Sequence, residues 1–325
     1  MRNKIKKNRW ISWILTLAML CSLLPTSAVP AFAADAAGAG VNISGATNLE
    51  DTAAEITTDG VYTISATRKT ALKVTAKGSV TLVLNNVNIT TDTSPIELGD
   101  GAKVTLVVKD NTTNVLTCTA TNLTADNSGK TAGILVPESA TLTIDRAQGA
   151  DGTGSLTVTG GYGGAGIGGS STDLTNNKQA GGTSGQAGGK APDANGNSAA
   201  TVGGAGGAAG PGGDGGRDGG NAVSAGSVTI NAGTITAIGG SGAAGIGGGR
   251  GRDGEKGKNG QPGRKGGNGG TRQAYYQASS ASGHGGWGGS GAGGNGGDGG
   301  NGGNGGVVAI SGGTVTAIGS GTAGI

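Results

Sequence analysis

The sequence predicts an all-β chain that folds as a right-handed parallel β-solenoid, also called a β-helix, with two long glycine-rich insertions. Three observations predict this class. Short runs alternate between apolar and polar residues and are bounded by Gly, Asn, Asp or Pro, as strands and turns are. The tripeptide Ala-Gly-Ile returns at intervals of 79 residues. Aromatic residues make up 2% of the chain, which suits a narrow aliphatic core better than a broad globular one.

Residues 1–33 are predicted to be a secretory signal peptide. Five basic residues lie within the first nine, an apolar run follows, and small residues precede a cleavage site after Ala33. A lipoprotein anchor at Cys21 is the alternative, but Leu20 stands where that site needs a small residue. We expect the protein to be secreted or on the cell surface, with membrane contact only through the cleaved peptide.

Removing this peptide changes the charge balance of the chain. The whole chain has 23 Lys and Arg against 20 Asp and Glu, and the five charges in residues 1–33 are all basic, so 18 against 20 remain, a net charge of −2. The basic pI therefore gives no reason to expect nucleic-acid binding. Cys118 is the one cysteine left, which excludes an internal disulfide.

Matched strand pairs precede the Ala-Gly-Ile copies, and more diverged copies precede these. Five isoleucines hold equivalent positions: Ile96, Ile134, Ile167, Ile246 and Ile325. Such positions predict an inward ladder, each side chain worth about 1.5–3 kcal/mol when fully buried. A β-sandwich also uses short alternating strands, but it gives no reason for one tripeptide to return at a fixed interval.

These patterns divide the chain into seven segments. They are the signal peptide 1–33, an N-terminal cap 34–59, solenoid turns 60–169, a glycine-rich insertion 170–226, a solenoid turn 227–249, a partly collagen-like glycine-rich insertion 250–306, and a solenoid turn 307–325. Both earlier Ala-Gly-Ile copies continue into Gly-Gly, whereas Ile325 is the last residue. We therefore expect a longer chain, with an anchoring domain downstream.

The insertions have a composition that by itself favours disorder, yet parts of them have a period of three. Asn295, Asp298, Asn301 and Asn304 are each followed by Gly-Gly. In an extended helix with three residues per turn, this spacing places the Asn and Asp side chains on one ridge and leaves two glycine faces free to pack. Bundled polyglycine II helices are thus an option. The collagen-like triplets from Gly251 to Gly266 are too few for a triple helix.

The residues give little support to catalysis or metal binding. His284 lies in Gly-His-Gly, which resembles one short motif of polygalacturonases, but the other motifs of that family are absent. The stretch from Gly293 to Asp298 fits the start of a calcium-binding nonapeptide repeat, except that Gly300 stands where the repeat needs an apolar residue. We expect no catalytic residue, no bound metal and no cofactor.

The second insertion contains the candidate binding residues Tyr275, Tyr276, His284 and Trp287. Aromatic faces with polar rims suit sugar rings and peptides alike. The alternative is that these rings pack on the glycine-rich backbone and order the loop.

A second candidate site rests on charge and would contact anionic wall polymers. Its residues are Arg250, Arg252, Lys256, Lys258, Arg264, Lys265 and Arg272. A merely solvated loop is the alternative. Paired threonines such as Thr157 and Thr159 are also expected to align on an outer face, as in ice-binding solenoids, although outward threonine is ordinary in strands.

Several segments, Ser94 to Gly99, Gly133 to Pro137 and the recurrent Thr-Ala-Ile-Gly and Ala-Gly-Ile-Gly-Gly, resemble a known family. It comprises Gram-positive secreted and cell-surface adhesin-like proteins with pectin-lyase-like parallel β-helix repeats, often labelled carbohydrate-binding. The resemblance spans roughly residues 41–325 apart from the insertions. It implies a non-catalytic, surface-exposed protein that binds glycans, such as cell-wall or extracellular polysaccharide, or another partner. A structural cell-envelope spacer and a polysaccharide lyase or hydrolase are the alternatives.

Overall fold

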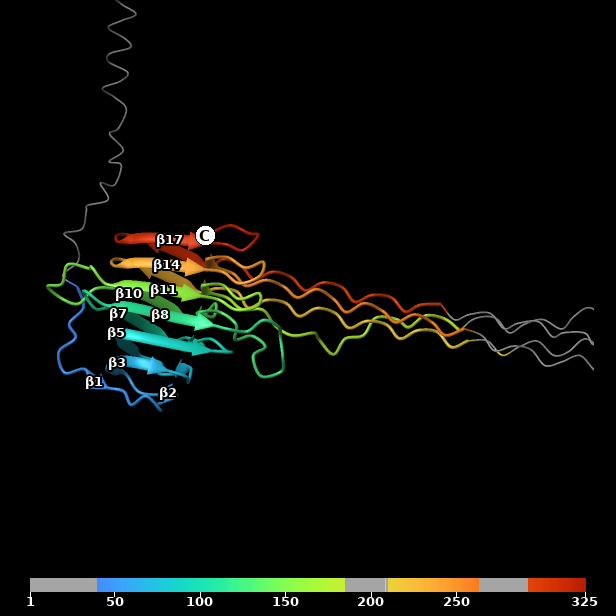
Figure 1. Cartoon of the computed structure of the whole chain (residues 1–325), viewed down its shortest axis with the longest axis horizontal. Helices are drawn as coiled ribbons and strands as arrows, with labels where there is room; N and C mark the ends of the chain where they lie inside the picture. The colour runs from blue at the N-terminus through green and yellow to red at the C-terminus, as the bar shows by residue number, and fades with distance from the viewer. Residues whose placement is uncertain (1–39, 185–207, 209, 263–291) are drawn as a thin grey trace, which may run out of the picture. The chain divides into compact units, whose positions relative to one another are not determined.

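The computed structural model of the chain describes residues 40–184, 208, 210–262 and 292–325 (Figure 1). Every secondary-structure element in this part is a β-strand, so the all-β prediction is confirmed for the described residues. Accordingly, no helix there is suited to span a bilayer. The predicted signal peptide lies outside the described residues. Residues Val41–Ile325 form one compact unit.

The described residues contain seventeen strands. They are β1 (Thr47–Asn48), β2 (Glu55–Ile56), β3 (Gly60–Arg68), β4 (Leu72–Val74), β5 (Ser79–Thr91), β6 (Ile96–Leu98), β7 (Lys103–Val108), β8 (Thr113–Cys118), β9 (Ile134–Leu135), β10 (Thr141–Asp145), β11 (Ser155–Thr159), β12 (Ile167–Gly168), β13 (Ser227–Ile230), β14 (Thr234–Ile238), β15 (Ile246–Gly247), β16 (Val307–Ile310) and β17 (Thr314–Ile318).

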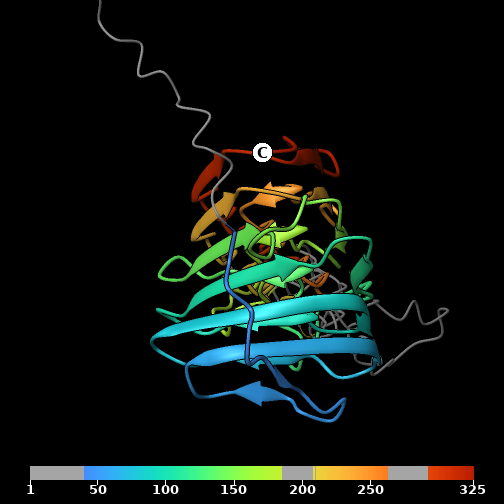
Figure 2. The same ribbon diagram turned by 90° about the vertical axis from the view of Figure 1, so that its left-hand side faces the viewer.

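The strands form two sheets, and neighbouring strands pair in parallel, as predicted. The larger sheet has the order β16-β13-β10-β7-β5-β8-β11-β14-β17, with β3 paired to β5 and β1 paired to β3, and the smaller has the order β15-β12-β9-β6-β4-β2. Along the chain, a short strand of the smaller sheet is followed by two strands of the larger one. This unit, which we call a tier, occurs as β6–β8, β9–β11, β12–β14 and β15–β17, and successive tiers stack (Figure 2).

An earlier tier is built differently, because one long strand occupies the place of two. Residues 79–84 of β5 pair with β7, and residues 88–91 of the same strand pair with β8. Asn86, between these stretches, has a φ of 54°, a left-handed conformation that Asn tolerates better than most residues. The buried Asn114 of β8 accepts a hydrogen bond from the Val87 N–H at 2.9 Å. This bond ties the irregular stretch of β5 to the next tier.

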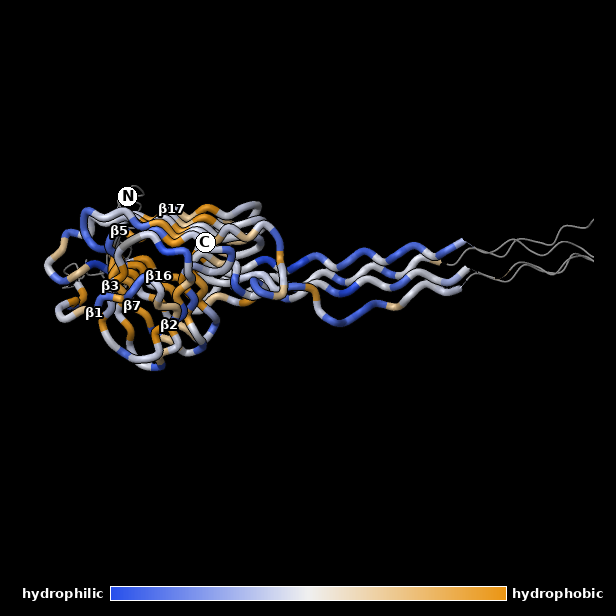
Figure 3. The backbone as a smooth tube through the Cα atoms, turned by 60° about the horizontal axis from the view of Figure 1, so that its bottom comes forward, coloured by the Kyte–Doolittle hydropathy of each residue, from blue (hydrophilic) through white to orange (hydrophobic). Residues whose placement is uncertain are grey.

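The core is the predicted isoleucine ladder and its neighbours. Ile96, Ile134, Ile167 and Ile246 pair in register from tier to tier, and each is 0% exposed. Their predicted equivalence is therefore confirmed. Ile325 lies in no strand and is 58% exposed. Hydrophobic positions gather in the stacked strands, whereas the glycine-rich segments are polar or neutral (Figure 3).

The described parts of the two insertions contain no helix or strand, but they bond to one another laterally. Four segments take part, residues 172–183, 210–225, 249–262 and 292–305, and together we call them the glycine bundle. The second segment donates to the fourth at a constant offset of 79 residues: Gly213 to Ala292, Gly216 to Asn295, Gly219 to Asp298, Ala222 to Asn301 and Ala225 to Asn304. Every third N–H of the second segment therefore donates to the fourth segment.

The third segment runs antiparallel to the second and fourth. It donates from Lys258 to Asp214, from Glu255 to Arg217 and from Arg252 to Gly220, and it accepts from Gly294, Gly297 and Gly300. Such close packing leaves no space for side chains at the contacts. A Cβ on Gly216 would lie 1.8 Å from the Glu255 carbonyl oxygen, and one on Gly297 would lie 1.9 Å from that of Arg217. Glycine is required at these positions by close approach of backbones.

Candidate functional site

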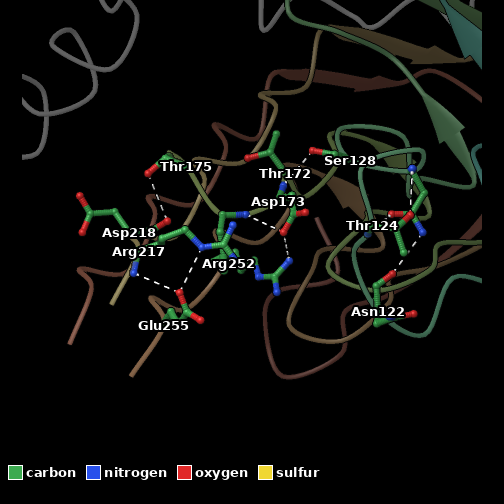
Figure 4. A network of polar contacts seen from close by, with 12 residues as sticks. Asn122, Thr124, Ser128, Thr172, Asp173, Thr175, Arg217, Asp218, Arg252 and Glu255 are labelled. Atoms are coloured by element: carbon green, nitrogen blue, oxygen red, sulfur yellow. Dashed lines mark hydrogen bonds and ion pairs between the residues drawn. The ribbon is translucent and has the colours of Figure 1, made fainter. Parts of the chain in front are cut away.

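The insertions leave the sheets beside the loop that joins β8 to β9. Ser170 Oγ accepts hydrogen bonds from the Thr131 and Ala132 N–H groups at 2.9 and 2.8 Å. Ser128 Oγ accepts one from the Asp173 N–H at 2.8 Å (Figure 4). We call this region the insertion root and define it as residues 119–131, 170–175, 217–220 and 250–255. Two serines thus fasten the first insertion to the strand scaffold.

The loop of the insertion root is held by its own buried amide. Asn127 is 5% exposed, its Oδ1 accepts the Thr124 N–H at 2.8 Å, and its Nδ2 donates to the Asn122 carbonyl at 3.1 Å (Figure 4). Asn122 and Thr124 themselves are exposed. A fixed backbone therefore presents amide and hydroxyl groups that can bond a polar ligand.

Ion pairs join the two insertions across the root. Arg252 of the second insertion pairs with Asp173 of the first, and the side chains are 26% and 35% exposed. Arg217 Nε lies 3.1 Å from Glu255 Oε2 (Figure 4). Hydrogen bonds from the Arg217 side chain and backbone lower the pKa of Glu255. The charges of the root thus serve mainly to hold the segments together.

A carboxylate at the outer side of the root is held by amides. Asp218 accepts hydrogen bonds from the Gln179 side chain and the Asn177 side chain, each at 2.7 Å, and from the Asp298 N–H at 2.9 Å. The Gln179 bond is the main reason why the pKa of Asp218 is lowered. Asn221 and Ser224 accept from the Asn301 and Asn304 N–H groups in the same way.

Four of the seven predicted anion-contact residues lie in the described part of the chain. Arg250 pairs with Asp253 at 2.6 Å and Lys258 with Asp214 at 3.3 Å, while Arg252 pairs with Asp173. Lys256 is exposed and makes no ion pair with another described residue. Arg264, Lys265 and Arg272 lie outside the described residues.

The described residues of the two insertions carry balanced charge. The cations are Lys178, Arg217, Arg250, Arg252, Lys256 and Lys258, and the anions are Asp173, Asp214, Asp218, Asp253, Glu255 and Asp298. An anionic polymer would have to compete with these carboxylates for the paired cations. The predicted contact with anionic polymers remains a prediction.

The predicted aromatic site, Tyr275, Tyr276, His284 and Trp287, lies outside the described residues. Another aromatic residue, Tyr162, was not singled out from the sequence. It lies half-buried in the turn after β11, and its N–H donates to the Ala120 carbonyl of the insertion root at 2.8 Å. The equivalent residue is Ser241 in the next tier and Ser320 in the tier after that. That departure from the repeat was the signal available in the sequence.

A hollow of about 500 Å³ lies near the C-terminal tier. Glycine backbone forms most of its wall, together with Ile246, Arg250, Thr322 and Ile325. Arg250 is its one ionisable side chain, so the hollow lacks the paired acid and base that hydrolysis of a glycosidic bond requires. Arg250 is moreover paired with Asp253.

The described residues also give little support to metal binding or to thiol chemistry. Within the described ranges, no three His, Cys, Asp or Glu side chains cluster in a way that could hold a metal ion. Cys118 is a free, buried thiol, and burial raises its pKa. A raised pKa keeps the thiol protonated and unreactive at neutral pH.

The stacked parallel sheets and the polar root define an all-β protein with an exposed hydrogen-bonding surface and two long insertions. The chain belongs to a family described as carbohydrate-binding domain-containing proteins, which matches residues 50–246. The matched range covers the insertion root up to Gly220 and the first insertion, and it ends before residues 275–287.

Comparison with solved structures finds a polysaccharide lyase-like protein from C. thermocellum. It is 19% identical, and the similarity covers 62% of this chain and 67% of that one with a TM-score of 0.29. A TM-score this low supports no conclusion about activity. No curated protein matches the chain.

Proposed function

We propose that this protein is a non-catalytic, surface-exposed carbohydrate-binding protein of adhesin-like type. The observation that carries the proposal is the family match, which extends over residues 50–246 and so includes the strands from β2 to β14 and the first insertion. Secretion through the signal peptide 1–33, cleaved after Ala33, is part of the same proposal and rests on the sequence alone.

The scaffold of the proposed protein is a right-handed parallel β-solenoid. Tier-to-tier parallel pairing and the buried isoleucine ladder support this architecture. Right-handedness is the expected sense, because crossover connections between parallel strands are almost always right-handed. The described part of the two insertions forms a polyglycine II-type bundle in this proposal, supported by lateral bonds at every third residue.

The proposed binding surface is the insertion root with Tyr162 beside it. Asn122 and Thr124 are exposed there, and Tyr162 is the half-buried aromatic residue joined to the same loop. An aromatic face flanked by hydroxyl and amide groups suits a sugar ring. The residues predicted from the sequence form the competing site, which lies beyond the range of the family match: Tyr275, Tyr276, His284 and Trp287.

A structural spacer in the cell envelope is the second candidate function. The bundle supports it, because its ion pairs and backbone bonds join the insertions to each other. The absence of catalysis remains part of the proposal. Release of products from pectin-like substrates, abolished by His284→Ala, would identify a lyase or hydrolase instead.

Binding to a glycan array tests these assignments. The unaltered chain should bind at least one glycan, Tyr162→Ala should weaken that binding, and the triple variant Tyr275→Ala, Tyr276→Ala, Trp287→Ala should retain it. Loss of binding only in the triple variant would move the site to the second insertion. No binding by the unaltered chain would leave the spacer as the better account.

A further inference from the structure

One outer face of the larger sheet carries rows of hydroxyl side chains. Parallel pairing of β8, β11, β14 and β17 aligns three rows of outward residues. The rows are Thr113, Ser155, Thr234 and Thr314; Val115, Thr157, Thr236 and Thr316; and Thr117, Thr159, Ile238 and Ile318. We call these twelve positions the hydroxyl face.

These side chains point away from the core. Alternate residues of the same strands, such as Leu116, Leu156 and Ile235, are 0% exposed, whereas the residues of the hydroxyl face are half-buried or exposed. The alternation follows from the strand period of two. Neighbouring strands lie about 4.8 Å apart, so each row repeats its side chains at that spacing across the tiers.

Within the described part of the chain, almost all hydroxyl groups of this face lack a hydrogen-bond partner. Of the nine hydroxyls, that of Ser155 donates to the Thr112 carbonyl at 3.3 Å. The other eight make no hydrogen bond with any described residue. A free hydroxyl both donates and accepts, so the face offers unused capacity of both kinds.

The face is also uncharged. None of the 21 residues of β8, β11, β14 and β17 is Asp, Glu, Lys or Arg. The face beside it differs, because β7 begins at Lys103 and β10 ends at Asp145. A face without charges offers no ionic attraction to a charged ligand, so it is suited to a neutral partner.

We propose that the hydroxyl face binds an extended, neutral polysaccharide that lies across the strands. The inference rests on the carbohydrate binding proposed above and adds a surface and a ligand class to it. Sugar hydroxyls would bond the threonine rows, and Val115, Ile238 and the threonine methyls would contact the apolar faces of the rings. Single contacts of this kind are weak, but a polymer makes many at once.

The position of the face supports this occupant. Tyr162 follows Thr159 by three residues in the turn after β11, so the third row lies at the strand ends nearest the insertion root. A polymer on the face therefore approaches the aromatic residue already assigned to binding. A charged polymer gains nothing from a face without charges, which distinguishes this surface from the basic residues predicted on the second insertion.

The test compares two isosteric triple variants. The first is Thr157→Val, Thr236→Val, Thr316→Val on the hydroxyl face. The matched control is Thr105→Val, Thr143→Val, Thr229→Val, which removes three hydroxyls from an in-register row of β7, β10 and β13. Valine keeps the shape and strand preference of threonine, so thermal unfolding of both variants should stay close to that of the unaltered chain.

Affinity electrophoresis in hydroxyethylcellulose, galactomannan and xyloglucan measures the binding, with polygalacturonate as the anionic probe. The hydroxyl-face variant should lose about ten- to a hundredfold in affinity for the neutral polymer bound, because each lost hydrogen bond weakens binding modestly. The control variant should bind as the unaltered chain does. Polygalacturonate should retard neither the control variant nor the unaltered chain.

Each contrary result is distinct. Equal binding by both variants would overturn the hydroxyl face while leaving carbohydrate binding intact. Retardation by polygalacturonate alone, removed by salt, would assign binding to the basic insertion instead. If the unaltered chain binds no polysaccharide, both the function and this surface fail; thermal hysteresis lost in the first variant would then identify an ice-binding face.

Discussion

The packing of the glycine bundle predicts opposite effects for an alanine substitution at two of its glycines, the buried Gly216 and the exposed Gly299. Gly216 donates to the Asn295 carbonyl at 2.8 Å and accepts from the Gln179 N–H at 2.8 Å, so it joins three of the four segments. Alanine there would place Cβ 1.8 Å from the Glu255 carbonyl oxygen, where ordinary contact begins at 3.4 Å. At Gly299, alanine would meet nothing within 4 Å.

The magnitude of the Gly216→Ala effect follows from what must move. Displacing the Glu255 backbone breaks its N–H bond to Arg217 at 2.8 Å and the bond it accepts from Gly297 at 2.7 Å. Two backbone bonds at about 1 kcal/mol each and the cost of overpacking, about 1–3 kcal/mol, give a loss of about 3–5 kcal/mol. Gly299→Ala should instead stabilise slightly, by about 0.4–1 kcal/mol, because Gly299 has no positive φ and alanine restricts the unfolded chain.

Hydrogen exchange measured by mass spectrometry on peptides from residues 210–225 and 292–305 checks this prediction. Local opening that costs less free energy raises the exchange rate, so Gly216→Ala should speed exchange by at least about a hundredfold, while Gly299→Ala should leave it equal or slower. Peptides from β10 and β11 serve as the internal reference. Equal exchange in the two variants would refute the lateral packing of the bundle.

Three further predictions concern the scaffold and the root. Ile167→Ala, in the middle of the buried ladder, should reduce the free energy of unfolding by about 2–5 kcal/mol in urea titration, and a loss under 1 kcal/mol would contradict a filled core. Asn114→Ala leaves the buried Val87 N–H unpaired and should cost about 1–3 kcal/mol, whereas an unchanged urea midpoint would mean that water replaces the amide. The pKa values of Asp218 and Glu255 are lowered from 3.8 and 4.5 in the folded protein, so their stabilisation is complete above these values and is lost as pH falls through the lowered pKa values. NMR amide shifts of the bundle should therefore change as pH falls below these ordinary values, and shifts that are constant into strong acid would exclude a role for these carboxylates.

Much of the scaffold could be predicted from the sequence because its repeat is regular. The equivalence of Ile96, Ile134, Ile167 and Ile246 follows from one recurring tripeptide, and the structure pairs these residues in register. The strand β8 has a weaker signal, since the polar Asn114 occupies a buried position of its alternating pattern. That amide bonds the irregular stretch of β5, a contact between tiers that local patterning does not reveal.

The insertions were predictable in period but not in partners. The triplet spacing indicated a glycine-faced extended helix, yet the antiparallel pairing of Lys258 with Asp214 depends on how the two loops fold back. For the same reason, the sequence count of basic residues overstated the free charge, because Arg252 pairs with Asp173 of the other insertion. Long-range register of this kind becomes visible only in three dimensions.

The structure adds a second candidate site to the one predicted at Tyr275, Tyr276, His284 and Trp287, because one aromatic residue interrupts a repeat. Tyr162 stands where the following tiers have Ser241 and Ser320, and it lies against the loop of the insertion root. The aromatic residues between 275 and 287 favour the second insertion as a binding site, whereas the carbohydrate-binding family match ends at residue 246. Comparing the copies position by position identifies such interruptions as candidates for function.

Direct titration of the unaltered chain with polysaccharides tests the central claim of carbohydrate binding. Isothermal titration calorimetry with hydroxyethylcellulose, galactomannan, xyloglucan and polygalacturonate should give saturable heat for at least one neutral polymer, unchanged in moderate salt, since uncharged contacts are not screened. The absence of saturable binding to every polymer in the set would contradict the claim.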